Sequence, residues 1–499
     1  MNRRPLAFVH HAVLTPPSPV DKTADADRLL QSLRDEGFGH VHIPVGLMRR
    51  IPAVLRQEDY KVKVILGLTG TGLCMIDAGC DRPFGIAIDI GSTNIEAVLL
   101  DLESGARLDG AGMANPQVQF GPDVLTRVQH AMMGRPEPLV DRLREGIDGL
   151  IDELCSRNSV SSDDIVAAAV AGNTIMTHFF LGLPVENIPV SPYVPARSAA
   201  VYASPDETGL KIHHNAVVYV FPNAGSYVGG DIISGMLSCD ILSEESPVLF
   251  IDVGTNVEVA LGCRDWVMVG AGAAGPALEG GVANIGRKAD PGSISGVRVD
   301  RGSTRIELDV IGGIEPVGIC GSGLIDLVSG LFTSGIIDAS GRFTGRGEGY
   351  EERDGERRYI VHRNGGSSLH ITENEIRNFL LSKAAMFSFL YVFVKSVGLG
   401  FRDIRKVYVA GALGCGINPE SAVAIGMLPD IPRERFISVG NSSLAGAAML
   451  LLDGSLTGTV DEIARKITYR EMNEDNELMN VLQGALFIPH TQPELLRGC

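Results

Sequence analysis

Two aspartates, each at the end of an apolar strand and just before a small polar turn, are the first residues of this chain whose setting suggests chemistry. Asp89 lies in FGIAIDIGSTNIEAVLL, which runs from residue 84 to residue 100. Asp252 lies in VLFIDVGTNVEVAL, which begins at residue 248. The second string repeats the order Asp, Gly, hydroxyl residue, Asn, Glu of the first, with a turn that is one residue shorter. Such a repeat predicts one chemical task performed at two places in the chain.

Both turns have the composition of a phosphate-binding loop. Glycine lets backbone N–H groups point into a concave turn, where hydroxyl and amide groups add further donors. An aspartate beside the phosphates can hold a hydrated magnesium ion or orient an attacking water. The alternative is that each string is only a tight hairpin of residues that favour turns. The candidate phosphate ligands are Gly91, Ser92, Thr93 and Asn94 in the first turn and Gly254, Thr255 and Asn256 in the second.

A third glycine-rich turn ends the apolar strand in VYVAGALGCGI, residues 407–417. Gly411 and Gly414, with Ala412 between them, would let the backbone approach a ribose or a flat ring closely. A glycine loop is weak evidence alone, but its position after two phosphate turns favours an adenosine loop. A helical string, GSYVGGDIISGML, adds Asp231 as a third candidate catalytic residue, and the alternative for it is a solvated helix position.

The elements around these turns indicate an α/β protein. Apolar residues recur at helical spacing from Leu139 to Leu154, and the polar start TENE at Thr372 predicts a capped helix through about Val397. Within that helix, AAMFSFLYVFV is too short to span a bilayer, so we expect a buried helix and no membrane contact. The charged stretch from Gly345 to Tyr359 predicts a solvated hairpin or loop.

Composition limits the possible partners. The 499 residues carry a formal net charge of −17, which argues against nucleic acid because binding to phosphate backbones needs clustered Lys and Arg. The eight cysteines show no CxxC and no iron–sulfur or zinc spacing, so we expect most of them to be small buried residues and expect no iron–sulfur cluster in this chain. No apolar segment of signal length follows Arg3 and Arg4, which favours the cytoplasm.

The three turns, in this order, resemble those of the superfamily of acetate and sugar kinases, heat-shock ATPases and actin. Within it the chain resembles the reductive activators of corrinoid proteins, which use ATP to return inactive Co(II) corrinoid to Co(I) on a partner. That resemblance runs from about residue 14 to Pro489 and rests on these strings: NPQVQFGPDVLTRV, AGNTIMTHFFLGL, AGAAGPALEGG, GICGSGLIDLVSGLF, ITENEIRNFLLSKAA, IGMLP and ALFIPH.

The resemblance implies a fold and a set of partners. It implies a two-lobed actin- or hexokinase-like ATPase, with duplicated RNase H-like lobes. We expect a small N-terminal α/β domain at 1–82, lobe 1 at 83–247, and lobe 2 at 248–499 with the adenosine loop and a C-terminal return segment. The two interlobe connecting helices would be the string around Asp231, where Gly229 and Gly230 permit close helix crossing, and VGNSSLAGAAMLLL, which contains the nucleotide candidate Asn441.

It also implies cofactors and partners: ATP, magnesium held by Asp89 and Asp252 through water, and a corrinoid. The corrinoid is expected on another protein, since the DxHxxG signature of corrinoid-binding modules is absent from this chain. An iron–sulfur domain, which family members usually have, is not expected here, so an external ferredoxin or flavodoxin would supply the electron to the corrinoid protein or methyltransferase. A homodimer is also implied.

Two residues of the predicted ATP site differ from the family's usual residues. Two other functions also stay open. Ala412 and Val257 stand where the family usually has glycine, and their side chains would crowd the nucleotide or change the backbone. If they do, the chain is a scaffold or chaperone for a corrinoid protein without ATPase activity. A small-molecule kinase would instead need a base, for which Asp231 is the candidate. Glu279 and Ser322 are the polar candidates in glycine strings expected near the cleft or the partner surface.

Overall fold

The chain forms two compact units. A computed structural model describes residues 4–79, 82–134, 136–254, 256–272, 281–300, 302, 304–353, 355–365, 367–411, 416–472 and 476–497. The first unit contains Met1–Ser238 and Ser442–Arg465, and the second contains Cys239–Asn441 and Lys466–Cys499. The chain therefore enters the second unit after residue 238 and returns to the first at residue 442.

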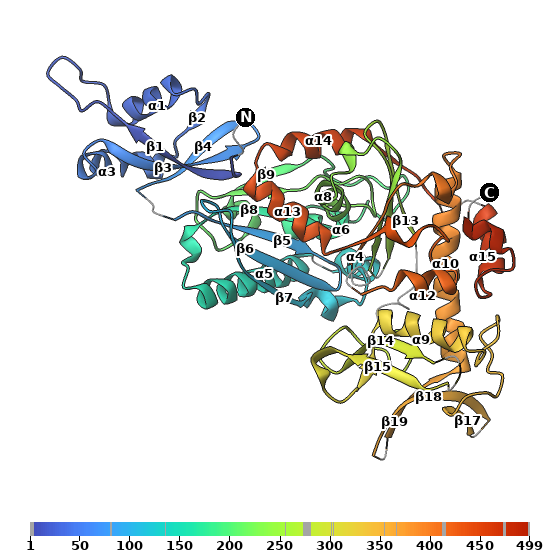
Figure 1. Ribbon diagram of the computed structural model, residues 1–499. Helices are drawn as coiled ribbons and strands as arrows, with labels where there is room; N and C mark the ends of the chain where they lie inside the picture. The colour runs from blue at the N-terminus through green and yellow to red at the C-terminus, as the bar shows by residue number, and fades with distance from the viewer. Residues whose placement is uncertain are drawn as a thin grey trace. The chain divides into compact units, whose positions relative to one another are not determined.

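The N-terminal part of the first unit is a four-stranded sheet covered by short helices (Figure 1). Leu29 and Leu33, which lie one turn apart on one helix, are both fully buried. The sheet order is β1 (Ala7–Val13), β3 (Lys61–Thr69), β4 (Gly72–Ala78) and β2 (Val41–His42), and the helices are α1 (Asp25–Asp35), α2 (Val45–Met48) and α3 (Ile51–Gln57).

The remainder of the first unit is built on a six-stranded sheet. Its first three strands form an antiparallel meander, and β8 and β10 then join parallel to β5. In spatial order the strands are β7 (Arg107–Ala114), β6 (Asn94–Asp101), β5 (Phe84–Ile90), β8 (Ile165–Gly172), β10 (Val217–Val220) and β9 (Val201–Ala203).

Helices cover both faces of this sheet (Figure 1). Ile86, Ile88 and Ile90 share a core with the long helix α5, on which the apolar residues predicted from Leu139 to Leu154 are all buried. Because side chains alternate along a strand, Asp89 faces the other side. The helices of this unit are α4 (Val124–Met133), α5 (Glu137–Asn158), α6 (Thr174–Leu181), α7 (Pro205–Thr208), α8 (Gly230–Ser238), α13 (Ser442–Leu452) and α14 (Leu456–Lys466).

The second unit repeats the same sheet. A meander of three antiparallel strands is again extended by two parallel strands, which confirms the duplicated α/β fold expected from the sequence. In spatial order the strands are β21 (Phe436–Gly440), β20 (Val407–Ala410), β11 (Val248–Val253), β12 (Val257–Gly262), β13 (Val267–Gly272) and β22 (Ile467–Tyr469).

Two three-stranded sheets complete the second unit. The charged stretch forms the hairpin of β17 and β18, as predicted. The strands are β15 (Ile306–Val310), β14 (Ser293–Val299) and β16 (Gly318–Ile319) in one sheet and β17 (Tyr350–Arg353), β18 (Glu356–Asn364) and β19 (Ser367–Thr372) in the other. The helices are α9 (Gly321–Thr333), α10 (Glu373–Lys395), α12 (Pro419–Ala424) and α15 (Asn476–Ala485).

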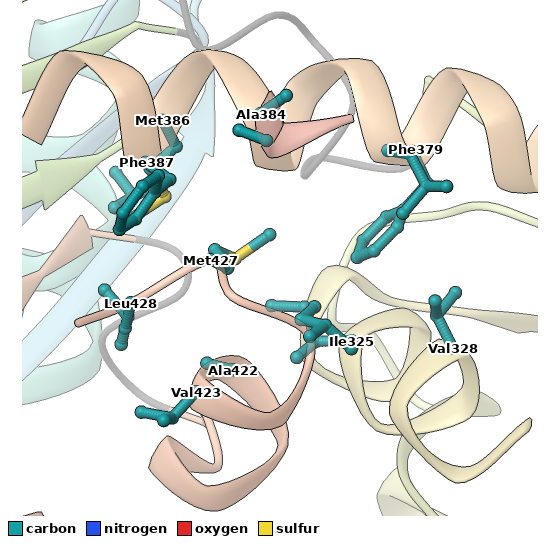
Figure 2. Close-up of a cluster of buried hydrophobic side chains, with 14 of the residues drawn as sticks. Ile325, Val328, Phe379, Ala384, Met386, Phe387, Ala422, Val423, Met427 and Leu428 are labelled. Carbon is teal, nitrogen blue, oxygen red and sulfur yellow. The ribbon is translucent and has the colours of Figure 1, made fainter. Parts of the chain in front are cut away.

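Helix α10 forms the centre of the second unit's core, where its side chains meet those of α9 and α12 (Figure 2). It begins with the predicted capping box between Thr372 and Glu375 and ends at Lys395. Among the described residues it is the one helix long and apolar enough to cross a membrane, but 72% of its most apolar window is buried inside the protein. This burial confirms the predicted core helix.

Candidate functional site

Asp89 and its neighbours form the most complete polar group of the first unit. Asp89 is half-buried at the end of β5. The Ser443 hydroxyl, in the first turn of α13, donates a hydrogen bond to Asp89 Oδ1 over 2.7 Å. A hydrogen bond from a neutral donor to a carboxylate favours the ionised form and fixes the orientation of the side chain.

Asp231 lies near Asp89, in the first turn of α8. Its Oδ1 accepts a hydrogen bond from the Ile232 N–H at 2.8 Å. Loss of water around the carboxyl group, and secondarily the negative charge of Asp89, raise the pKa of Asp231 to about 7. Asp231 is half-buried, so its carboxyl group is only partly in contact with solvent. A carboxyl group that titrates near neutral pH can exchange a proton with a reacting water.

Asn115 holds the turn after Asp89 with two hydrogen bonds. This residue is 1% exposed, and its side-chain amide donates to the Gly91 carbonyl at 2.8 Å while its backbone N–H donates to the Thr93 carbonyl at 2.8 Å. Gly91 has no room for a side chain, because a Cβ there would lie 2.5 Å from the Asn94 carbonyl oxygen. Ser92 and Thr93 are half-buried and Asn94 is exposed. The first turn is thus a tightly supported loop.

In the second unit, Asp252 occupies the equivalent place at the end of β11. It is half-buried, and it pairs across the sheet with Glu258, as Asp89 pairs with Glu96. The turn is closed by a hydrogen bond of 3.0 Å from the Gly254 N–H to the Asn256 carbonyl. Thr255 lies outside the described residues.

The glycine at the end of β20 is required by packing against Asp252. Gly411 has a φ of +80°, and a Cβ there would collide with Asp252 Oδ1 and, at 2.6 Å, with the Val253 carbonyl oxygen. Close pairing of β20 with β11 therefore explains this glycine without a nucleotide. Ala412 and Gly414 lie outside the described residues, and Asn441 is half-buried directly before α13.

Val257 does not crowd the turn. Its side chain is 1% exposed and belongs to the core of the second unit, opposite Val253 in the β-ladder. The expectation that an isopropyl group at this position would obstruct a nucleotide or distort the backbone is therefore wrong, because the side chain points into the core and φ is not positive.

Gly229 and Gly230, which precede Asp231, do not lie at the crossing of two helices as expected. A Cβ on Gly229 would lie 2.5 Å from the Gly172 carbonyl oxygen, and one on Gly230 would lie 2.6 Å from the Phe221 Cβ, so both pack against strand ends. The crossing of α8 and α13 instead occurs at Gly446, where an added Cβ would collide with the Ser234 carbonyl oxygen.

Two of the strings that carry the family resemblance contain buried packing contacts, made by Ser322 and Lys383. Ser322 is 8% exposed and donates to the Ser295 carbonyl at 2.9 Å, which ties α9 to β14. Lys383 is fully buried and donates to three carbonyls of the ALFIPH region, those of Ala485, Phe487 and Pro489, at 2.6–2.8 Å. Glu279 lies outside the described residues.

The residues present fit a magnesium ion bound mainly through water and phosphate. No group of three or more His, Cys, Asp or Glu side chains that could hold a metal occurs in the described parts of the chain. Magnesium rarely needs such a group, because one or two carboxylates together with substrate phosphates and water usually hold it. Asp89 and Asp252 each offer such a carboxylate.

Sequence reasoning missed two residues of the first unit's site, Asn115 and Ser443. Both lie inside strings that the sequence singled out, NPQVQFGPDVLTRV and VGNSSLAGAAMLLL, but neither carries a charge. Their roles depend on contacts with distant parts of the chain, which composition and spacing do not encode.

Three family models match the chain in succession. They are the RACo linker region over residues 1–80, the RACo middle region over 84–244, and the C-terminal domain of RACo, the ASKHA domain, over 246–498. The chain is also similar to a solved structure, "Reductive activator for corrinoid,iron-sulfur protein", with 36% identity and a TM-score of 0.92, covering 99% of this chain and 81% of that one.

Two curated proteins are similar to most of the chain. The "Corrinoid activation enzyme RamQ" of Eubacterium limosum is 31% identical over 423 residues, which cover 80% of this chain and 70% of that protein. The "[Co(II) methylated amine-specific corrinoid protein] reductase" of Methanosarcina barkeri is 26% identical over 415 residues, which cover 77% of this chain and 73% of that protein.

Proposed function

Because the chain belongs to the family of ATP-dependent reductive activators of corrinoid proteins, with an ASKHA domain at residues 246–498, we propose that it returns the cobalt of a corrinoid-carrying partner from Co(II) to Co(I). The observation that carries this proposal is the repeated aspartate turn. Asp89 and Asp252 stand near the end of the first strand of two sheets that share the order of five of their six strands. This duplication supports ATP hydrolysis as the source of energy.

In the proposed hydrolysis, the chain's carboxylates have separate tasks. Asp89 in the first unit and Asp252 in the second would each offer a carboxylate for magnesium bound through water, and the ion would supply neutralisation of the phosphate charge. Asp231 accepts a proton from the attacking water when it is ionised. Gly411 and Asn441 would lie next to the adenosine group of ATP. The raised pKa of Asp231 supports its role, since a base is most effective when its pKa lies near the working pH.

The electron is proposed to come from a separate ferredoxin- or flavodoxin-type protein. Reduction of Co(II) to Co(I) consumes one electron, and ATP hydrolysis supplies none. The scattered cysteines of the sequence, which show no CxxC and no iron–sulfur spacing, support a donor on another protein. The role of ATP is to change the affinity for the corrinoid partner, because only differential binding to two states can shift their equilibrium.

The deciding experiment is anaerobic visible spectroscopy of a Co(II)-corrinoid partner protein. The partner is mixed with this protein and reduced ferredoxin or flavodoxin, with ATP present or omitted. We expect the Co(I) band only when the chain, ATP and donor are all present. Co(I) formation without the added donor would overturn the external source of the electron.

Two other outcomes would replace the proposal. Partner binding with no effect of ATP on the spectrum would make the chain a scaffold or chaperone. Phosphorylation of a small acid or sugar by the purified protein would make it a kinase. The proposed homodimer is checked separately by light scattering of the purified protein, where a mass of one chain would exclude it.

A further inference from the structure

Ser443 donates a hydrogen bond to the aspartate of the first turn, and it comes from a part of the chain 354 residues away. It lies in the first turn of α13 and is 4% exposed. Its hydroxyl reaches Asp89 Oδ1 at 2.7 Å. The contact lies within the first unit, since both residues belong to it.

The backbone of Ser443 is fixed as firmly as its side chain. The Ser234 hydroxyl of α8 donates to the Ser443 carbonyl at 2.7 Å, and Ser234 is fully buried. Gly446, one turn further along α13, lies directly against the Ser234 carbonyl oxygen with no space for a side chain. The close crossing of α8 and α13 therefore fixes the position from which the Ser443 hydroxyl donates to Asp89. A small shift of α13 would move this hydroxyl.

The contact between Ser443 and Asp89 lies next to the point where the chain returns to the first unit, and this position suits it to regulation. The chain leaves the first unit after Ser238, at the end of α8, and re-enters it at Ser442, where α13 begins. Ser443 is thus the second residue after the return from the unit that carries Asp252. A change in the second unit that moves the start of α13 would therefore also move the hydroxyl that donates to Asp89.

We propose that Ser443 is a positioning residue that orients the Asp89 carboxylate for ATP hydrolysis and links that orientation to the start of α13. The inference rests on the proposed function, because it assigns Asp89 to the hydrolysis site. It predicts that loss of the hydroxyl slows turnover while ATP binding, which depends mainly on the loops themselves, is retained.

The neighbouring serine provides a matched control. Ser442 is 1% exposed, and its buried hydroxyl has no hydrogen-bond partner in the described structure. Removing an unpartnered buried hydroxyl is neutral or stabilising, whereas removing the partner of a carboxylate is costly. Ser442→Ala and Ser443→Ala therefore remove the same atom from the same helix turn with different consequences.

The kinetic test compares Ser443→Ala, Ser443→Thr and Ser442→Ala with the wild type. We expect Ser443→Ala to lower the kcat of ATP hydrolysis about 10- to 100-fold, the range for a hydrogen bond to a charged group, with the KM for ATP within about twofold. Ser443→Thr, which keeps the hydroxyl, should recover most of the rate, and Ser442→Ala should match the wild type. Equal rates for the two alanine variants would overturn the inference.

A second measurement needs no nucleotide. In a double-mutant cycle on thermal unfolding, Ser443→Ala should lower the apparent Tm by about 2–4 °C in the wild-type background and leave it unchanged in the Asp89→Ala background. An equal loss in both backgrounds would show that Ser443 serves only helix packing. If the wild type hydrolyses no ATP with its partner, the proposed function fails; if it does and Ser443→Ala does so equally well, this inference alone fails.

Discussion

The two aspartate turns are close copies in sequence but are supported in different ways. The first turn is held by Asn115 from behind and by Ser443 at its aspartate, and its Gly91 has no space for a side chain. At the second turn, no atom of the described residues lies within 4 Å of a Cβ placed on Gly254. The first turn is therefore a fixed frame held by close contacts, and the glycine of the second turn has no such packing among the described residues.

Removing either aspartate should have the largest effect. We expect Asp89→Asn and Asp252→Asn each to lower ATP turnover at least about a hundredfold, the usual loss when a charge that stabilises a transition state is removed. If the first turn is the fixed frame, Asp89→Asn should be the more damaging of the two. The measurement is steady-state phosphate release with the corrinoid partner present.

The control for that pair is Glu145→Gln on the exposed surface of α5. Glu145 pairs only with Arg142, three residues earlier, and both side chains are more than half exposed. Such a surface pair contributes little to stability, so this variant should keep full turnover. Loss of activity in Glu145→Gln would mean that the assay reports general damage, and equal activity of all three variants would remove both aspartates from the site.

The glycines of the two turns give the sharpest contrast. Gly91→Ala should raise the KM for ATP about tenfold or more, since its Cβ would stand 2.5 Å from the Asn94 carbonyl oxygen and must displace the loop. Gly254→Ala meets open space and should change the KM less than about twofold. The same substitution thus tests both turns, and equal effects would contradict the difference in support.

The fold could be predicted well from this sequence because its signals are local. The helix from Leu139 to Leu154 and the cap at Thr372 follow from spacing and side-chain chemistry within one element. The site could be predicted only in part. The aspartates were visible as a repeat, whereas Val257 was misjudged because a single sequence does not reveal which face of a strand its side chain occupies. The domain boundaries and the roles of the individual site residues stay predictions.

Asn115 supports the first turn through hydrogen bonds, so its replacement should have a moderate effect on the KM for ATP. Asn115→Asp keeps the oxygen that accepts from the Gln117 N–H but loses the amide donor to the Gly91 carbonyl. One buried hydrogen bond is worth about 1 kcal/mol, so we expect the KM for ATP to rise about fivefold. Gln119→Ala, at an exposed position in the same segment, should leave it unchanged. An Asn115→Asp variant with normal ATP affinity would show that the turn holds its shape without this clamp.

The pH dependence of stability tests the surroundings of the first turn through Asp231, which lies near Asp89. We expect this effect to be the smallest. The pKa of Asp231 is raised from an ordinary 3.8 to about 7 by burial and by Asp89. The folded state therefore binds more protons than the unfolded state between about pH 4 and pH 7, so stability decreases as the pH rises through that window. Asp231→Asn removes this penalty. Its apparent Tm should match the wild type near pH 4 and exceed it by a few degrees at pH 8. A Tm difference that is constant with pH would mean that the pKa of Asp231 is that of an ordinary carboxylate, and Asp231 would then be a weaker base near neutral pH than proposed.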